Sequence, residues 1–196
     1  MPVPQPSDTP KNVVVQPAAI GGALKNRELI SQGENAAVEK LGGTNDAQRA
    51  VRTGLSWLAR QQTSDGKWEL HQGYPDAAFK VIRTDTGATA LALLAFLGAG
   101  HTAYHGEHAP VVKKGLKWLV EIQDPETGDL HDQRQEEGRQ AAFYAHAMAT
   151  MALCEALAIT QDDALRVPAE KAVKYLIDAQ HPESGGWNPV MKDRSQ

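Results

Sequence analysis

KGLKWLVEIQDPETGDL, at residues 114–130, is a stretch that the chain repeats twice more. Its counterparts are GLSWLARQQTSDGKW at residues 54–68 and KAVKYLIDAQHPESGGW at residues 171–187. We call the three copies, in chain order, the first, second and third motifs. All three contain a small residue, an aromatic, a Gln, a Gly and a terminal Trp or Leu in the same order. The aligned positions are Trp57, Trp118 and Tyr175 (aromatic), Gln62, Gln123 and Gln180 (glutamine), and Trp68, Leu130 and Trp187 (terminal residue).

The composition of the chain is typical of a soluble globular protein. Its 196 residues are 41% hydrophobic and 22% charged, which are ordinary proportions for such proteins. A net charge of −4 gives no electrostatic reason to expect nucleic acid as a partner. Cys154 is the only cysteine, so no intrachain disulfide can form. No run approaches the roughly 18 apolar residues of a membrane span, and we see no signal peptide. We therefore expect a cytoplasmic protein without a transmembrane segment.

Two kinds of helical pattern alternate from residue 47 onward. Residues 47–62, 110–123 and 168–180 are amphipathic, and Pro110 and Pro168 are expected in the first turns of their helices. Residues 85–98 and 141–159 are apolar on nearly every face. Helices of that kind must be covered by other parts of a protein. The alternation predicts an all-α fold in two layers, with residues 85–98 and 141–159 inside.

The ends of the chain differ from its middle. Residues 1–43 include a proline-rich start with little to bury, so we expect a disordered or weakly ordered segment there. Residues 44–187 form the repeat domain, and residues 188–196 form a tail.

The motif resembles the QW motif of the squalene–hopene and oxidosqualene cyclases, and is related to the repeat of protein prenyltransferase β subunits. The resemblance covers about residues 47–187. We expect the protein to be of the bacterial type. It implies an α/α toroid in which each motif ends an outer helix and leads into an inner one. This chain has about two and a half helix pairs, fewer than a closed toroid of the family, so we expect a partial toroid. We expect the motif to be structural, with the Gln amide satisfying backbone groups at a helix end.

The carboxylate chemistry of the cyclases has little support in this sequence. The cyclases protonate an isoprenoid with a D-x-D-D cluster, and the nearest stretch here is residues 83–86, RTDT. It contains one carboxylate, that of Asp85, and either Thr84 or Asp85 can cap the helix that follows, so we expect Asp85 to be a cap and not an acid. We therefore predict no catalytic residue.

Metal chemistry is also weakly supported. The prenyltransferases need zinc held by Asp, Cys and His, but Cys154 lies in an Ala-rich apolar helix and is expected to be a small buried hydrophobe. His101, His105 and His108 lie among glycines and a proline, in an expected loop where their spacing fixes no geometry. We predict no metal and no cofactor.

Two loops, residues 69–83 and 131–140, each lead from a motif into an inner helix. The resemblance places both at one rim of the toroid, where a pocket is plausible by analogy. The residues expected to bind a ligand there are Arg83, Asp85, His131, Tyr144 and His146.

Two functions are consistent with these features of the sequence. The leading hypothesis is a squalene-cyclase-like repeat domain that is non-catalytic or uncharacterised and binds a hydrophobic small molecule or a protein partner. The alternative is an isoprenoid-processing enzyme, of the triterpene cyclase or prenyltransferase type, of which this chain is a fragment. We also expect self-association, because a partial toroid leaves apolar surface uncovered. That surface is expected near Met148, Met151 and Leu157, or near Leu91 and Leu94.

Overall fold

A computed structural model describes residues 43–70, 84–132 and 141–187. These residues form five helices and no strand, which confirms the all-α prediction for this part of the chain. The predicted N-terminal segment, all but residue 43, and the predicted tail lie outside the described residues. The helices are α3 (Asn45–Gln61), α4 (Asp85–Gly98), α5 (Ala109–Ile122), α6 (Ala142–Thr160) and α7 (Asp163–Asp178).

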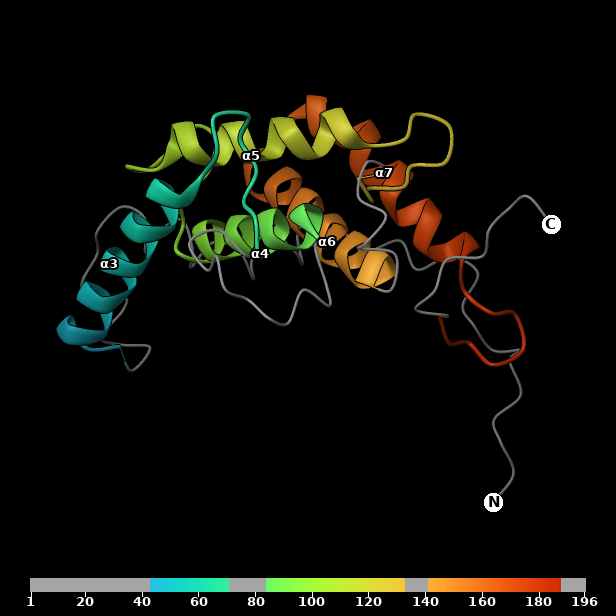
Figure 1. Cartoon of the computed structure of the whole chain (residues 1–196), viewed down its shortest axis with the longest axis horizontal. Coiled ribbons are helices and arrows are strands. Elements are labelled where there is room, and N and C mark those ends of the chain that lie inside the picture. Colours follow the sequence, from blue (N-terminus) through green and yellow to red (C-terminus); the bar gives the residue numbers. More distant parts are fainter. Residues whose placement is uncertain (1–42, 71–83, 133–140, 188–196) are drawn as a thin grey trace, which may run out of the picture.

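The helices form the two expected layers. Figure 1 shows α4 and α6 adjacent to each other beneath α5. Ten of the fourteen residues of α4 are buried, whereas α3 buries Leu55 alone. α4 packs chiefly on α6, while α5 packs on α4, and α7 packs on α6. α4 and α6 are therefore the inner helices, and α3, α5 and α7 the outer ones.

The core is built where the two layers meet. Phe96, Leu93, Leu119 and Leu153 are completely buried side chains contributed by three different helices. The face between α4 and α6 is rich in alanine, and small side chains allow two helix axes to approach closely. The fully buried alanines of these two helices are Ala90, Ala145, Ala149, Ala152 and Ala156.

Side-chain caps begin three of the helices. The Thr44 hydroxyl accepts a hydrogen bond from the Ala47 amide at 3.1 Å and so caps α3. At the start of α4 the Thr84 hydroxyl accepts from the Gly87 amide at 3.0 Å. Thr84 is therefore the cap of the two that the sequence offered, and the cap role expected for Asp85 is wrong, because Asp85 is already the first residue of the helix.

The predicted start of α7 is also wrong. Asp162 caps the helix by accepting from the Ala164 amide at 3.0 Å, so Pro168 lies inside the helix rather than at its start. Proline has no N–H and therefore cannot donate to the Ala164 carbonyl four residues earlier. A single missing hydrogen bond near the helix start does not end α7. The other helix boundaries lie within two residues of the predicted ones.

α6 is the one helix among the described residues that is long and apolar enough to cross a membrane by length and composition. Half of its apolar window is buried within the molecule, and it packs against α4 and α7. Core helices of soluble proteins pass the same test, so this observation is weak evidence for a span.

Candidate functional site

The first motif joins its own outer helix to the next one. The Gln62 side-chain amide donates to the Gly66 carbonyl at 2.8 Å, which closes the turn after α3. It also donates to the Val111 carbonyl in the first turn of α5, at 2.9 Å. The Gln was expected to satisfy its own helix end. Its second bond instead crosses to the following outer helix.

The second motif repeats this contact. The Gln123 amide donates to the Gly128 carbonyl at 3.1 Å and to the Pro168 carbonyl of α7 at 3.0 Å. Consecutive outer helices are thus connected in the same way at both junctions.

The motif glycines approach the next helix too closely for any other residue. A Cβ atom on Gly66 would lie 2.6 Å from the Lys114 carbonyl oxygen, and one on Gly128 would lie 2.5 Å from that of Lys171. Both glycines also have positive φ, +102° and +82°. Glycine adopts such angles without steric cost, so the motif requires glycine for two separate reasons.

The terminal residue of the first motif fills the junction. Trp68 is buried, and its indole N–H donates to the Leu58 carbonyl at 2.8 Å. Its backbone amide donates to the Thr89 hydroxyl of α4 at 3.0 Å. The ring also lies against α5, because a Cβ added at Gly115 would be 3.0 Å from it. One tryptophan therefore connects α3, α4 and α5.

The third motif makes the hydrogen bonds within its own repeat, but none to a following outer helix among the described residues. The Gln180 amide donates to the Gly185 carbonyl at 2.7 Å, and no second acceptor is present among the described residues. The Trp187 indole donates to the Leu176 carbonyl at 2.8 Å, but the side chain remains exposed.

Asp85 belongs to a charged cluster at the start of α4. Its carboxylate is buried and accepts from the Lys67 ammonium at 2.6 Å. Lys67 also pairs with Glu69 at 3.0 Å. Burial lowers the pKa of Lys67, but hydrogen bonds and charges from Asp85 and Glu69 outweigh this effect and leave the pKa raised. The cluster therefore holds a charged lysine beside the carboxylate.

His146 of α6 is a fully buried structural junction. The Leu130 amide donates to its Nδ1 at 3.0 Å, so that Nε2 is the ring nitrogen left to donate. Nε2 then donates to the Ala172 carbonyl of α7 at 3.0 Å. The ring lies 4.5 Å from that of Tyr175, centroid to centroid. His146 thus replaces, in the second repeat, the hydroxyl of Thr89 that binds the first motif.

The other residues predicted to bind a ligand are placed in different surroundings. The Thr86 hydroxyl donates to the Leu130 carbonyl at 2.9 Å, which brings the start of α4 beside His131. His131 is buried, and its Nδ1 makes no hydrogen bond within the described part of the chain. Tyr144, by contrast, is 62% exposed on α6. Arg83 lies outside the described residues.

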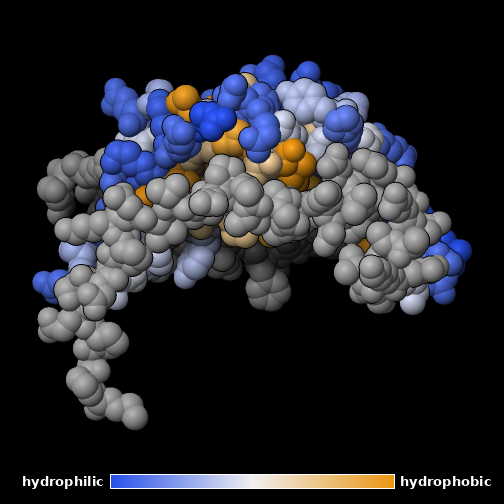
Figure 2. All heavy atoms as spheres, turned by 180° about the vertical axis from the view of Figure 1, so that it is seen from behind, coloured by the Kyte–Doolittle hydropathy of each residue, from blue (hydrophilic) through white to orange (hydrophobic). Residues whose placement is uncertain are grey.

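An apolar surface on α4 and α6 is the feature of the inner layer that is open to solvent. Leu91, Tyr144 and Met151 are large hydrophobic side chains with more than half of their surface exposed, at 51%, 62% and 60%. Leu91 and Met151 were among the residues expected to be uncovered. Leu94, Met148 and Leu157 are partly buried. Figure 2 shows hydrophilic residues with smaller hydrophobic patches on the outer-helix side, and Val167 and Ile177 of α7 are also exposed.

The histidine constellation between α4 and α5 forms a packed cluster. The rings of His101 and His108 meet edge to face at 4.9 Å, and both pack against Phe96, whereas His105 is exposed. Burial and the neighbouring His108 lower the pKa of His101. Within the described ranges no three His, Cys, Asp or Glu side chains are arranged to hold a metal ion. Cys154 is half-buried, and burial raises its pKa.

Comparison with known proteins identifies the repeat. Residues 33–148 match the squalene-hopene cyclase C-terminal domain. The chain belongs to this family. A terpene cyclase–glycosyl transferase fusion protein of Humicola fuscoatra is 35% identical over 88 residues, which are 43% of this chain and 6% of that relative. The chain therefore spans a small part of that protein. No solved structure matches the chain.

The squalene-hopene cyclase match covers the first two motifs. It includes α3, α4 and α5 and ends within α6. α7 and the third motif lie beyond the matched residues, yet α7 receives Gln123 and Gly128 as α5 receives Gln62 and Gly66, and the third motif repeats the bond between its Gln and its Gly. The structural repeat therefore extends further than the family match.

Proposed function

We propose that this chain acts as a non-catalytic squalene-cyclase-like scaffold that binds a hydrophobic small molecule on its inner helices. The observation that carries this proposal is the exposed apolar surface of Leu91, Tyr144 and Met151. Large apolar side chains that are exposed on one layer of a folded protein can form a ligand or protein interface. Tyr144 adds an aromatic face and a hydroxyl, which suit a largely apolar ligand with one polar end.

The charged cluster at the start of α4 supports a role without catalysis. Protonation of an isoprenoid requires a carboxylic acid that carries its proton. The Asp85 carboxylate is instead paired with the Lys67 ammonium, from which it accepts a hydrogen bond at 2.6 Å. His146 has both ring nitrogens bonded to the main chain.

Binding is tested with a fluorescent apolar probe, anilinonaphthalene sulfonate, and with squalene as a competitor. Leu91→Lys and Met151→Lys should each weaken probe binding several-fold, and squalene should displace the probe. Val167→Lys is the matched control, because Val167 is 56% exposed on an outer helix and should leave probe binding unchanged. Equal binding by all three variants would exclude the inner surface as the site.

A second candidate is part of an isoprenoid-processing enzyme. It is favoured by the family match and by the relative named as a terpene cyclase fusion. Under the scaffold proposal, the purified chain gives no product from squalene, or from a prenyl diphosphate with a thiol peptide. Turnover that Asp85→Asn abolishes would support the enzyme instead.

A further inference from the structure

The outer helix α3 has an uncovered face that matches the faces on which the motifs pack. When Trp57 is aligned with Trp118, three residues of α3 take the positions that Val111, Lys114 and Gly115 have in α5, in that order. In α5 these positions receive the Gln, the Gly and the Trp of the first motif. We call the equivalent residues the α3 face: Ala50, Thr53 and Gly54.

The α3 face is open. All three of its residues are exposed. A Cβ atom added to Gly54 would meet no atom within 4 Å, whereas one on Gly115 would lie 2.9 Å from Leu93 and 3.0 Å from Trp68. The adjoining Trp57 is 49% exposed, although Trp118 at the same position in α5 is 3% exposed.

The third motif lacks, within the described residues, the contacts that the first two motifs make with the next outer helix. Gln180 lacks the second acceptor that the other two glutamines have within the described residues. Gly185 has φ of +69° and meets only the Gln180 amide, at 3.9 Å, where the other motif glycines meet a helix carbonyl. Trp187 is 48% exposed, whereas Trp68 and Leu130 are buried.

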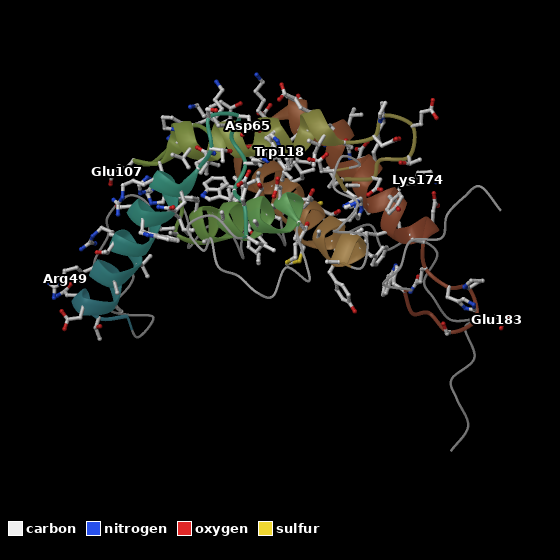
Figure 3. The ribbon with its side chains drawn as sticks, in the orientation of Figure 1. Arg49, Asp65, Glu107, Trp118, Lys174 and Glu183 are labelled. Atoms are coloured by element: carbon white, nitrogen blue, oxygen red, sulfur yellow. The ribbon has the colours of Figure 1, made fainter. Side chains whose placement is uncertain are left out.

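The two open surfaces lie at opposite ends of the molecule. Figure 3 shows Arg49, on α3, at one end and Glu183, in the third motif, at the other. Both of these residues are exposed, and Arg49 is paired with Asp46 of the same helix. A surface that fits a different surface on an identical molecule produces head-to-tail association.

We infer that a second copy of this chain covers the α3 face with its third motif. The Gln180 amide of one copy donates to the Ala50 carbonyl of the next. Gly185 packs on the Thr53 carbonyl, and Trp187 covers Gly54. The partner is a copy of this chain because the chain already makes this contact twice between its own repeats. The inference concerns association alone and does not depend on the proposed ligand.

Sedimentation velocity of the full chain and of two blocked variants tests this inference. Gly54→Trp fills the α3 face, and Gln180→Ala with Trp187→Ala disables the third motif. Wild type should sediment faster as its concentration rises, and each blocked variant alone should remain monomeric. An equimolar mixture of the two should form a dimer and nothing larger, since each variant keeps one intact surface.

Arg52→Trp is the matched control. It lies two residues from Gly54, about 200° around the helix, and should associate like wild type. Thr53→Arg provides a second block of the α3 face, with circular dichroism to verify folding. A wild type that is monomeric at every concentration would overturn the inference and leave the face to another occupant, such as a further repeat. Blocked variants that associate like wild type, or that fail to dimerise when mixed, would also overturn it.

Discussion

α3 and α5 differ in what surrounds them, although each contains the helical part of a motif. We call the Gly and the aromatic residue of this helical part the template glycine and the template aromatic. The template aromatic is 3% exposed in α5, as Trp118, and 49% exposed in α3, as Trp57. The template glycine is closely packed in α5, as Gly115, and open in α3, as Gly54. The local sequences are closely similar, so the difference arises from the preceding repeat, which covers α5 and has no counterpart on α3 among the described residues.

This difference shows that the motif stabilises the repeat that follows it. Each of the first two motifs supplies a Gln donor and a closely packed glycine to the next outer helix, and the first also supplies the Trp68 ring. The positions of an outer helix that accept a motif are therefore covered only where a motif reaches them. Equivalent substitutions should have unequal effects at the covered and the open junctions.

The largest inequality is expected for the template aromatics. Trp118→Ala should lower the free energy of unfolding by about 3–5 kcal/mol, because it leaves a large cavity in the core. Trp57→Ala should cost about 1 kcal/mol, since much of that ring is in solvent. Urea denaturation of both variants measures the difference. Equal losses would mean that the two junctions are energetically alike.

The motif glutamines should show a smaller difference in the loss of stability on substitution. Gln123→Ala removes the donor to the Gly128 and Pro168 carbonyls, and should cost about 1–3 kcal/mol. Gln180→Ala removes one hydrogen bond in an exposed turn, and should cost less than about 0.5 kcal/mol. The comparison uses denaturation midpoints at a concentration where the chain is monomeric. If Gln123→Ala leaves the midpoint unchanged, the bond to α7 contributes nothing to stability.

Replacing the template glycines by Ala should change the free energy of unfolding by small amounts of opposite sign. Gly54→Ala should stabilise the chain by about 0.5–1 kcal/mol, because Ala favours an exposed helix. Gly115→Ala should destabilise it by about 1 kcal/mol, because its methyl group would press on the buried side chains of Leu93 and Trp68. Thermal unfolding of the two variants gives the signs. Stabilisation by both would show that the packing at Gly115 relaxes readily.

Helix type and position could be predicted from sequence because they depend on local pattern. The apolar runs of α4 and α6 and the amphipathic pattern of α5 place these helices within a residue or so of their bounds. Pro168 misled the prediction of α7, because proline favours a helix start but is tolerated five residues further along when Asp162 supplies the cap. The start of a helix is decided by competing local signals, and sequence alone does not rank them.

The candidate site was less predictable, because it depends on contacts between distant residues. The sequence identified Gln62 as structural, but the acceptor in α5 lies 49 residues away and has no local signature. The role of His146 depends on the Leu130 amide and the Ala172 carbonyl, which only the fold brings together. The pairing of Asp85 with Lys67 could have been suspected. Lys67 lies at the end of the first motif, which leads into α4, and Asp85 is the first residue of α4.

The most direct test is the solvent exposure of the four tryptophans, read by 19F NMR of chain labelled with 5-fluorotryptophan. Single substitutions assign the resonances, and the shift between H2O and D2O reports exposure of each ring. In dilute solution, Trp57 and Trp187 should show a large solvent shift, and Trp68 and Trp118 almost none. A solvent shift for Trp118 as large as that for Trp57 would contradict the claim that each motif covers the outer helix that follows it.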